Sequence, residues 1–185
     1  MTGALANAAF FQVGWWIAVL GAGHGYVWIS PLLVVCLVCV NIRLSTDPSS
    51  TIRIVLTVGL FGSLLDSALA AVGVLQFVHS PFDSPWCPPW LIALWCLFAT
   101  TLTGSLQWLT GRQRTAALLG GICGPLSYVA GHQFGALRLG GHERLSLLLL
   151  SFFWAILLPL VLRWAASGRV SSPIRPPSCR GNEIG

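Results

Sequence analysis

Asp66 is the residue whose type and position most favour chemistry, because it lies at the midpoint of the apolar run from Ile52 to Val78. An ionisable side chain at the centre of a membrane span costs roughly 3 kcal/mol or more, so it usually marks a functional site or a buried interhelical contact. The residues one and two turns away on its helical face are all small, namely Gly59, Gly62, Ala70 and Gly73. Small residues let a second helix approach closely, so we expect Asp66 to face the interior of a helix bundle.

Polar side chains in other apolar segments are expected at a similar depth. They are Gln12, Thr100, Thr101, Ser127 and Tyr128, and His132 lies about one turn beyond Tyr128. Arg and His are not expected at this level, so burial predicts that Asp66 is protonated and donates to a hydroxyl group. Two interpretations stay open. Asp66 is either a neutral contact that holds helices together, or a proton or cation relay or a polar group that awaits a substrate.

The segment from Thr115 to Ala136 carries the second notable pattern. Its glycines form a stripe of Gly120, Gly124, Gly131 and Gly135, with Pro125 near the middle. Tyr128 and His132 are four residues apart on an adjacent face, which is the spacing of an interacting pair on a helix. The pattern is typical of a tightly packed, kinked helix, or of a broken helix that lines a small polar cavity shared with Asp66.

Six apolar segments position these residues: 8–23, 28–42, 52–78, 90–109, 115–136 and 145–163. A helix needs about 20 residues to cross roughly 30 Å of hydrocarbon, and the first two segments are short for that purpose. Those two form either a pair of thin spans or a re-entrant hairpin. The sequence therefore predicts an all-α fold, a polytopic transmembrane helix bundle of about six spans. It forms a single domain (1–166) followed by a disordered tail with Arg and Pro (167–185).

The composition excludes a soluble globular fold. Hydrophobic residues make up 55% of the chain and charged residues only 8%, whereas soluble domains carry about 25% charged residues.

All ten basic residues are Arg, and only Arg138 and Arg144 fall on the side of the predicted membrane opposite to the other eight. The positive-inside rule then places both termini in the cytoplasm. The expected partners are the lipid bilayer, a membrane protein or a second copy of the chain, and not a nucleic acid.

The sequence contains no motif for a cofactor or for catalysis. The absence of Lys removes Schiff-base chemistry and the phosphate-binding lysine of nucleotide-binding loops. The four His residues are scattered over loops and one helix without the spacing of a metal site, so no metal or other cofactor is expected. The chain lacks the G-x-S-x-G motif of serine hydrolases.

Four stretches, taken in order, resemble a family of small bacterial inner-membrane proteins catalogued as domain of unknown function twenty-eight seventy-eight. The stretches are Phe10–Ala22, Ser63–Phe77, Pro88–Leu109 and Gly120–Leu137. The residues that match the family pattern are Gln12, Gly14, Trp15, Asp66, Trp95, Ser105, Trp108, Gly124, Pro125 and Tyr128. The resemblance implies a multi-pass inner-membrane protein of uncharacterised activity, with an association with lipid-modifying enzymes such as cyclopropanating methyltransferases.

Three functions from different classes are compatible with these residues. The first is a non-catalytic membrane component or accessory subunit linked to lipid modification, favoured by the lack of catalytic motifs. The second is a small proton- or ion-linked carrier that uses Asp66 at the bilayer midplane, where carrier sites usually lie. The third is a membrane-embedded enzyme that acts on a lipid or quinone, favoured by the polar layer and by Tyr128 and His132.

Overall fold

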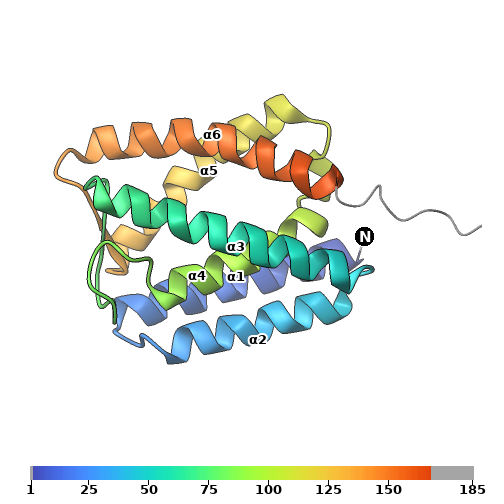
Figure 1. The fold of residues 1–185 in the computed structure, drawn as a ribbon, viewed down its shortest axis with the longest axis horizontal. Helices are drawn as coiled ribbons and strands as arrows, with labels where there is room; N and C mark the ends of the chain where they lie inside the picture. Colours follow the sequence, from blue (N-terminus) through green and yellow to red (C-terminus); the bar gives the residue numbers. More distant parts are fainter. Residues whose placement is uncertain (1, 168–185) are drawn as a thin grey trace, which may run out of the picture.

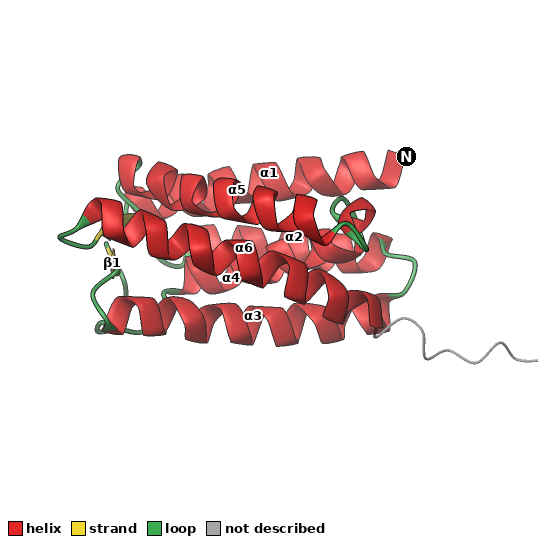
Figure 2. Ribbon diagram, turned by 90° about the horizontal axis from the view of Figure 1, so that it is seen from above, coloured by secondary structure: helices red, strands yellow, loops and turns green. Residues whose placement is uncertain are grey.

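The computed structural model of the protein describes residues 2–167, and the predicted tail lies outside them except for its first residue. The described elements are α1 (Thr2–Gly23), α2 (Ile29–Leu44), α3 (Pro48–Ala71), β1 (Leu75–Phe77), α4 (Pro89–Thr103), the 3-10 turn η1 (Gln107–Leu109), α5 (Gln113–Gln133), β2 (Leu137–Leu139) and α6 (Glu143–Ser167). The helices run side by side along the long axis (Figures 1 and 2). The predicted all-α class is confirmed, with one short two-stranded ribbon added to it.

Three of the described helices are long and apolar enough to cross a membrane, namely the one within Gly3–Gly23, Pro48–Ala71 and Glu143–Ser167. Two shorter helices, α2 and α4, are also apolar. α3 shows how such a helix is oriented in the bundle. Its large residues Leu56, Leu60 and Leu64 are exposed, whereas its small-residue face is buried. This inverted pattern suits hydrocarbon outside the bundle, since small residues let helices pack closely inside it. Six complete spans remain a prediction.

Two helices end well before the sequence predicted. α3 stops at Ala71 rather than continuing to Val78, because Gly73 adopts a left-handed conformation with φ of 77° and turns the chain into β1. Glycine alone takes that conformation without steric cost. α4 stops at Thr103, and the backbone N–H of Ser105 donates to the side-chain oxygen of Asn7, at 2.9 Å. A side chain of α1 thus replaces the next helical turn of α4.

α3–β1–α4 and α5–β2–α6 are two copies of one helix–strand–helix unit. α5, like α3, ends at a glycine of positive φ, Gly135, with φ of 75°. The backbone N–H of Gly73 donates to the carbonyl of Ala70, and that of Gly135 donates to the carbonyl of His132. Each hydrogen bond spans three residues, and the neighbouring hydrogen bonds at the two helix ends match as well. The sequence did not reveal this repeat.

The ribbon that joins the two units has pseudo-two-fold symmetry. β1 and β2 are antiparallel, and Gln76 at the centre of β1 pairs with Arg138 at the centre of β2. The backbone hydrogen bonds that flank the ribbon also occur as a pair, since Val78 donates to Ala136 at 3.2 Å and Gly140 donates to Val74 at 2.9 Å. α1 and α2 lie outside this repeat and pack on α4.

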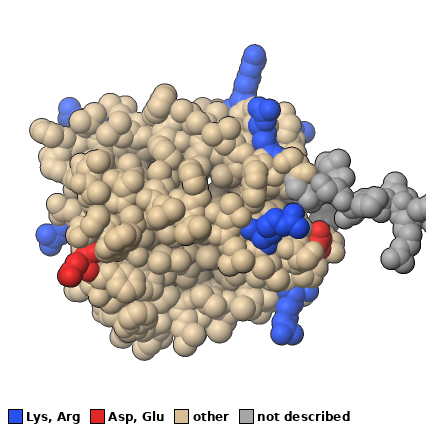
Figure 3. All heavy atoms as spheres, viewed as in Figure 1, with Lys and Arg blue, Asp and Glu red and all other residues tan. Residues whose placement is uncertain are grey.

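Arginine side chains gather at one end of the bundle, where the described chain begins and ends (Figures 1 and 3). Arg43 lies in the last turn of α2, and Arg112 is the residue that precedes α5. Arg138 and Arg144 lie at the other end, in β2 and at the start of α6. The two ends of the bundle therefore differ in positive charge.

We predict that Gly73→Ala and Gly135→Ala destabilise the protein by similar amounts, about 1–2 kcal/mol each, because a Cβ is disfavoured in the left-handed conformation. A Cβ at Gly73 would meet no atom within 4 Å, so the loss would come from the backbone alone. Thermal unfolding of the purified protein in detergent measures the effect.

Gly141→Ala is the matched control, since Gly141 also has open space around it but does not have a positive φ. Unfolding temperatures that fall equally for all three variants would contradict the prediction.

Candidate functional site

Asp66 is fully buried and accepts a hydrogen bond at each carboxyl oxygen. The indole Nε1 of Trp95, on α4, donates to Oδ2 at 2.6 Å. The hydroxyl of Tyr128, on α5, donates to Oδ1 at 2.6 Å. All three side chains are at most 5% exposed. The carboxyl group therefore joins three helices from both repeat units in the centre of the bundle. The small residues on the same face of α3 predicted this interior position.

This pairing gives Asp66 the hydroxyl partner that the sequence predicted, and it adds the indole of Trp95 as a second partner. Both partners are oriented as donors, and an indole N–H has no other role. The sequence identified Tyr128 at the correct depth but did not identify Trp95 as a partner of Asp66. The sequence singled out Trp95 only as one of the residues that match the family pattern.

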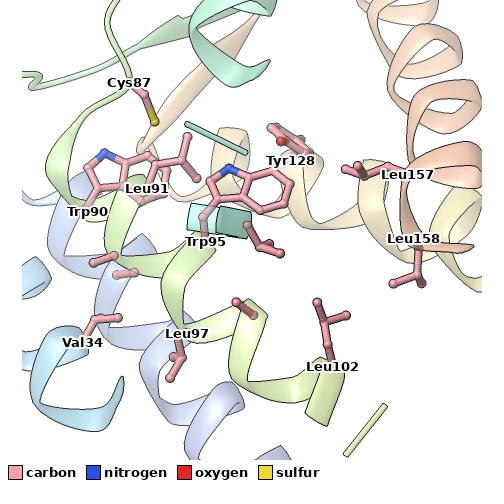
Figure 4. Close-up of a cluster of buried hydrophobic side chains, with 14 of the residues drawn as sticks. Val34, Cys87, Trp90, Leu91, Trp95, Leu97, Leu102, Tyr128, Leu157 and Leu158 are labelled. Carbon is pink, nitrogen blue, oxygen red and sulfur yellow. The ribbon is translucent and has the colours of Figure 1, made fainter. Parts of the chain in front are cut away.

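The surroundings of Asp66 and Tyr128 repeat the pseudo-two-fold symmetry of the ribbon. Trp95 and Trp154 come from the second helices of the two units and stack face to face, with ring centroids 5.2 Å apart and an interplanar angle of 2°. Trp95 bonds to Asp66, and Trp154 is a second polar neighbour of Tyr128. Asp66 and Tyr128 are thus equivalent positions that meet at the axis. Figure 4 shows Trp95 and Tyr128 beside each other in the core.

Two glycines create the space for the stacked indoles. A Cβ on Gly62 would collide with the ring of Trp95, and a Cβ on Gly124 would collide with the ring of Trp154. Gly59 is similarly close to Cys96, the residue after Trp95. In a bilayer, such close approach replaces the hydrophobic effect as the source of helix association.

The other glycines predicted to pack helices have three different roles. Gly120 belongs with the packing glycines, because its Cβ would collide with the backbone of Trp154. A Cβ on Gly131 would lie 3.3 Å from the side chain of Leu137 in the ribbon, and not against another helix. Gly73 and Gly135 are turn residues. Gly73 and Gly135 matched the small-residue stripes of the sequence because a glycine just after a helix can continue the spacing of the small residues on one helical face.

A cavity of about 790 Å³ lies beside the indoles, between α1, α4, α5 and α6. Trp95, Tyr128 and Trp154 form part of its wall, and Asp66 lies behind them. The lining also includes Trp16 of α1 and Leu126 of α5, which are exposed by 42% and 58%. The cavity is therefore open between α1 and α5. In a membrane this opening faces hydrocarbon, and both the volume and the apolar lining are typical of a small-molecule site.

Three more of the predicted polar residues also line this cavity: Gln12, Thr101 and Ser127. The Thr101 hydroxyl donates to the carbonyl of Phe98 at 2.6 Å, and the Ser127 hydroxyl donates to the carbonyl of Gly124 at 2.7 Å. The Gln12 side chain has no hydrogen bond to any residue of the described chain. The predicted polar layer is thus divided between a sealed carboxyl group and an open cavity.

Thr100 and His132 lie apart from Asp66. Thr100 belongs to a second polar cluster, in which Nδ2 of Asn7 donates to Oδ1 of Asn41 at 2.7 Å and contacts the Thr100 hydroxyl at 3.3 Å. The sequence did not single out this cluster, which ties α1, α2 and α4 together. His132 does not pair with Tyr128, because its Nδ1 contacts the carbonyl of Leu137 at 3.3 Å.

The described residues contain no group of three His, Cys, Asp or Glu side chains that would hold a metal ion.

Trp90, at the start of α4, is buried with its Nε1 unpaired within residues 2–167, and Figure 4 shows this nitrogen on the side toward Cys87. Burial raises the pKa of the Cys87 thiol well above its usual value, which disfavours a reactive thiolate. The arrangement around Asp66 therefore supports packing and ligand contact better than covalent chemistry.

We predict that Trp95→Phe destabilises the protein by about 1–3 kcal/mol, because it keeps an aromatic ring at this position but leaves Oδ2 of Asp66 buried and unpaired. Trp154→Phe should cost less, since Tyr128 keeps its hydrogen bond to Asp66. Thermal unfolding in detergent gives the comparison.

Trp108→Phe is the control for the loss of an indole, because Trp108 is 53% exposed. A Trp95→Phe variant as stable as Trp108→Phe would contradict the importance of the bond to Asp66.

The comparisons with known proteins agree with the resemblance seen in the sequence. Neither a curated protein nor a solved structure matches the chain. The model of a family described as a protein of unknown function, DUF2878, matches residues 4–160, which include Asp66, Trp95 and Tyr128 and at least part of each of the six described helices. The chain therefore belongs to the DUF2878 family.

Proposed function

We propose that this protein is a non-catalytic component of the bacterial inner membrane, an accessory subunit linked to lipid modification. The observation that carries the proposal is the complete pairing of Asp66 by Trp95 and Tyr128. Asp66, the side chain whose burial in the bundle costs the most free energy, joins three helices. The role of Asp66 is then to hold the two repeat units in one arrangement, as a scaffold requires.

The same pairing argues against Asp66 as the site of a carrier. A relay must exchange protons or ions with both sides of the membrane, and carrier sites lie at cavities between helices. Asp66 has no exposed surface, and the rings of Trp95 and Tyr128 separate it from the cavity.

A membrane-embedded enzyme acting on a lipid or quinone is the second candidate. The observation that favours it is the lateral cavity, because a substrate dissolved in the bilayer would enter between α1 and α5. The same opening supports a link to lipids for a non-catalytic component. Catalysis by the Cys123 thiol or by the Ser and Thr hydroxyls of the cavity wall would require an activating base, and no His, Asp, Glu or Lys is among the described residues that line the cavity.

The unequal charge of the two ends supports a multi-pass protein with six spans and both termini in the cytoplasm. Excess Arg marks the cytoplasmic end of membrane proteins. In the described bundle, that end contains the start of α1, the loop between α2 and α3, the loop between α4 and α5, and the end of α6.

We predict that Asp66→Asn accumulates in the membrane at nearly the level of the unaltered protein. The Asn oxygen can accept from Trp95, and its amide can donate to the oxygen of Tyr128, so both polar partners stay paired. Asp66→Leu leaves both donors unpaired and should destabilise the protein by several kcal/mol, at about 1–3 kcal/mol for each donor. Membrane levels and thermal unfolding distinguish the two variants.

The functional readout is the lipid composition of cells that lack the protein. The proposal expects an altered composition that the unaltered protein and Asp66→Asn both restore. Restoration by the former but not by a well-folded Asp66→Asn would favour a titrating carboxyl group. A proton flux into reconstituted vesicles that Asp66→Asn abolishes would establish the carrier instead.

We also predict the topology of the bundle. A membrane-impermeant thiol reagent should label the Ser45→Cys variant in opened cells but not in intact cells, because the loop between α2 and α3 lies at the Arg-rich end. In Gly141→Cys it should label intact cells directly. The unaltered protein gives the background from its own cysteines, and labelling of both variants from the same side would contradict six spans.

A further inference from the structure

We infer that the cavity between α1 and α5 is a binding site for a single uncharged lipid, one that carries a carbonyl or hydroxyl group on a hydrocarbon chain. This goes beyond the accessory role proposed above, which depends on the sealed Asp66 and not on the cavity. A lipid-filled crevice exists beside many helices, so the argument depends on the features that distinguish this one.

The first feature is the absence of charge. Among the described residues that line the cavity, none is an acid, Arg or His, although its volume is about 790 Å³. A phosphate or carboxylate placed there would be desolvated without a counter-charge, which is prohibitively costly. The occupant is therefore uncharged, and this excludes the headgroup of a phospholipid.

The second feature is an unpaired polar group. Gln12 lies near the middle of α1, is exposed, lines the cavity, and has no hydrogen bond within the described chain. Leaving an amide unpaired in hydrocarbon costs roughly 4–8 kcal/mol relative to water. The Ser105 hydroxyl, which also lines the cavity, has no hydrogen-bond partner in the described part either. Thr101 and Ser127 have already donated their protons to backbone carbonyls.

Gln12 and Ser105 are close along the bundle axis. The backbone N–H of Ser105 bonds to Asn7, which precedes Gln12 by little more than one helical turn. Two free donors therefore lie in the half of the cavity toward the Arg-rich end. A carbonyl or hydroxyl oxygen of the ligand would satisfy them.

The third feature is the rigid aromatic wall that the rest of the ligand would contact. Trp95 and Trp154 are held by their stacking and by Gly62 and Gly124, so the wall does not collapse into the cavity. Phe98 packs edge-on against both indoles, with ring centroids 5.7 and 5.5 Å away. The hydrocarbon chain of the lipid would pack against these fixed surfaces, entering from the bilayer between α1 and α5.

The test uses the purified full-length protein in nanodiscs made of one phospholipid, with a brominated long-chain alcohol as the probe. Bromine quenches tryptophan fluorescence on contact, and several indoles line the cavity. We expect saturable quenching. Gln12→Leu should weaken the apparent affinity by about five- to tenfold, the value of one hydrogen bond. Cys123→Phe, which narrows the opening from α5, should abolish the saturable component.

Gln76→Leu is the matched control, because it makes the same change on the ribbon, outside the cavity. Thermal unfolding of each variant shows whether it is folded, and a second lipid-facing narrowing variant, Leu126→Trp, replaces Cys123→Phe if that protein is unstable. Gln12→Leu and Gln76→Leu with equal affinities would overturn the assignment of Gln12.

Quenching that rises linearly and is the same in Cys123→Phe would overturn the proposal, since the cavity would then contain only bulk lipid. Equally saturable quenching by brominated phosphatidylglycerol would overturn the assignment of an uncharged ligand. A stable dimer whose contact buries Gln12 would also overturn it, because a second copy would then occupy the groove. None of these results would change the accumulation of Asp66→Asn, so the accessory role and the lipid site fail separately.

Discussion

A carboxyl group within an apolar bundle must have its polar atoms paired by protein, because hydrocarbon offers no water to pair them. Asp66 meets this requirement only if α4 brings Trp95 and α5 brings Tyr128 to it at the same time. Displacing either helix leaves a polar atom unpaired at a cost of about 1–3 kcal/mol. The hydrogen bonds are also directional, whereas the contacts between apolar surfaces are not. The single carboxyl group therefore selects one arrangement of three helices from the many that apolar packing would allow.

The repeat explains why these particular residues meet. Equivalent positions of two units related by a two-fold axis approach each other at that axis, and Asp66 and Tyr128 occupy such positions. Two aspartates there would repel each other, and one would have to be protonated. One acceptor and one donor satisfy each other instead. The stacked indoles of Trp95 and Trp154 follow the same symmetry and seal the pair.

The sequence predicted the all-α class, the burial of Asp66 and the depth of Tyr128, because these depend on hydrophobicity and on the small-residue face of one helix. It did not predict Trp95 as a partner, since an indole in an apolar segment is compatible with packing, a membrane interface or a hydrogen bond. The repeat was also missed. Its signal was that Gly62 and Gly124, Asp66 and Tyr128, and Gly73 and Gly135 are all separated by the same number of residues. That signal is visible only when helix ends and packing contacts are compared together.

Trp95 and Tyr128 contact both the buried carboxyl group of Asp66 and the open cavity. The helices on the two sides of the cavity opening, α1 and α5, are nevertheless held by different contacts. α5 packs mainly on α6 and the ribbon, whereas α1 packs on α2 and α4. At the ribbon end, α1 approaches the end of α5 so closely that a Cβ on Gly23 would collide with the backbone of Phe134. Away from that contact, α1 and α5 can separate without breaking any hydrogen bond of Asp66. The centre of the bundle and the lateral cavity therefore depend on different contacts, because the polar network of Asp66 joins α3, α4 and α5 but not α1.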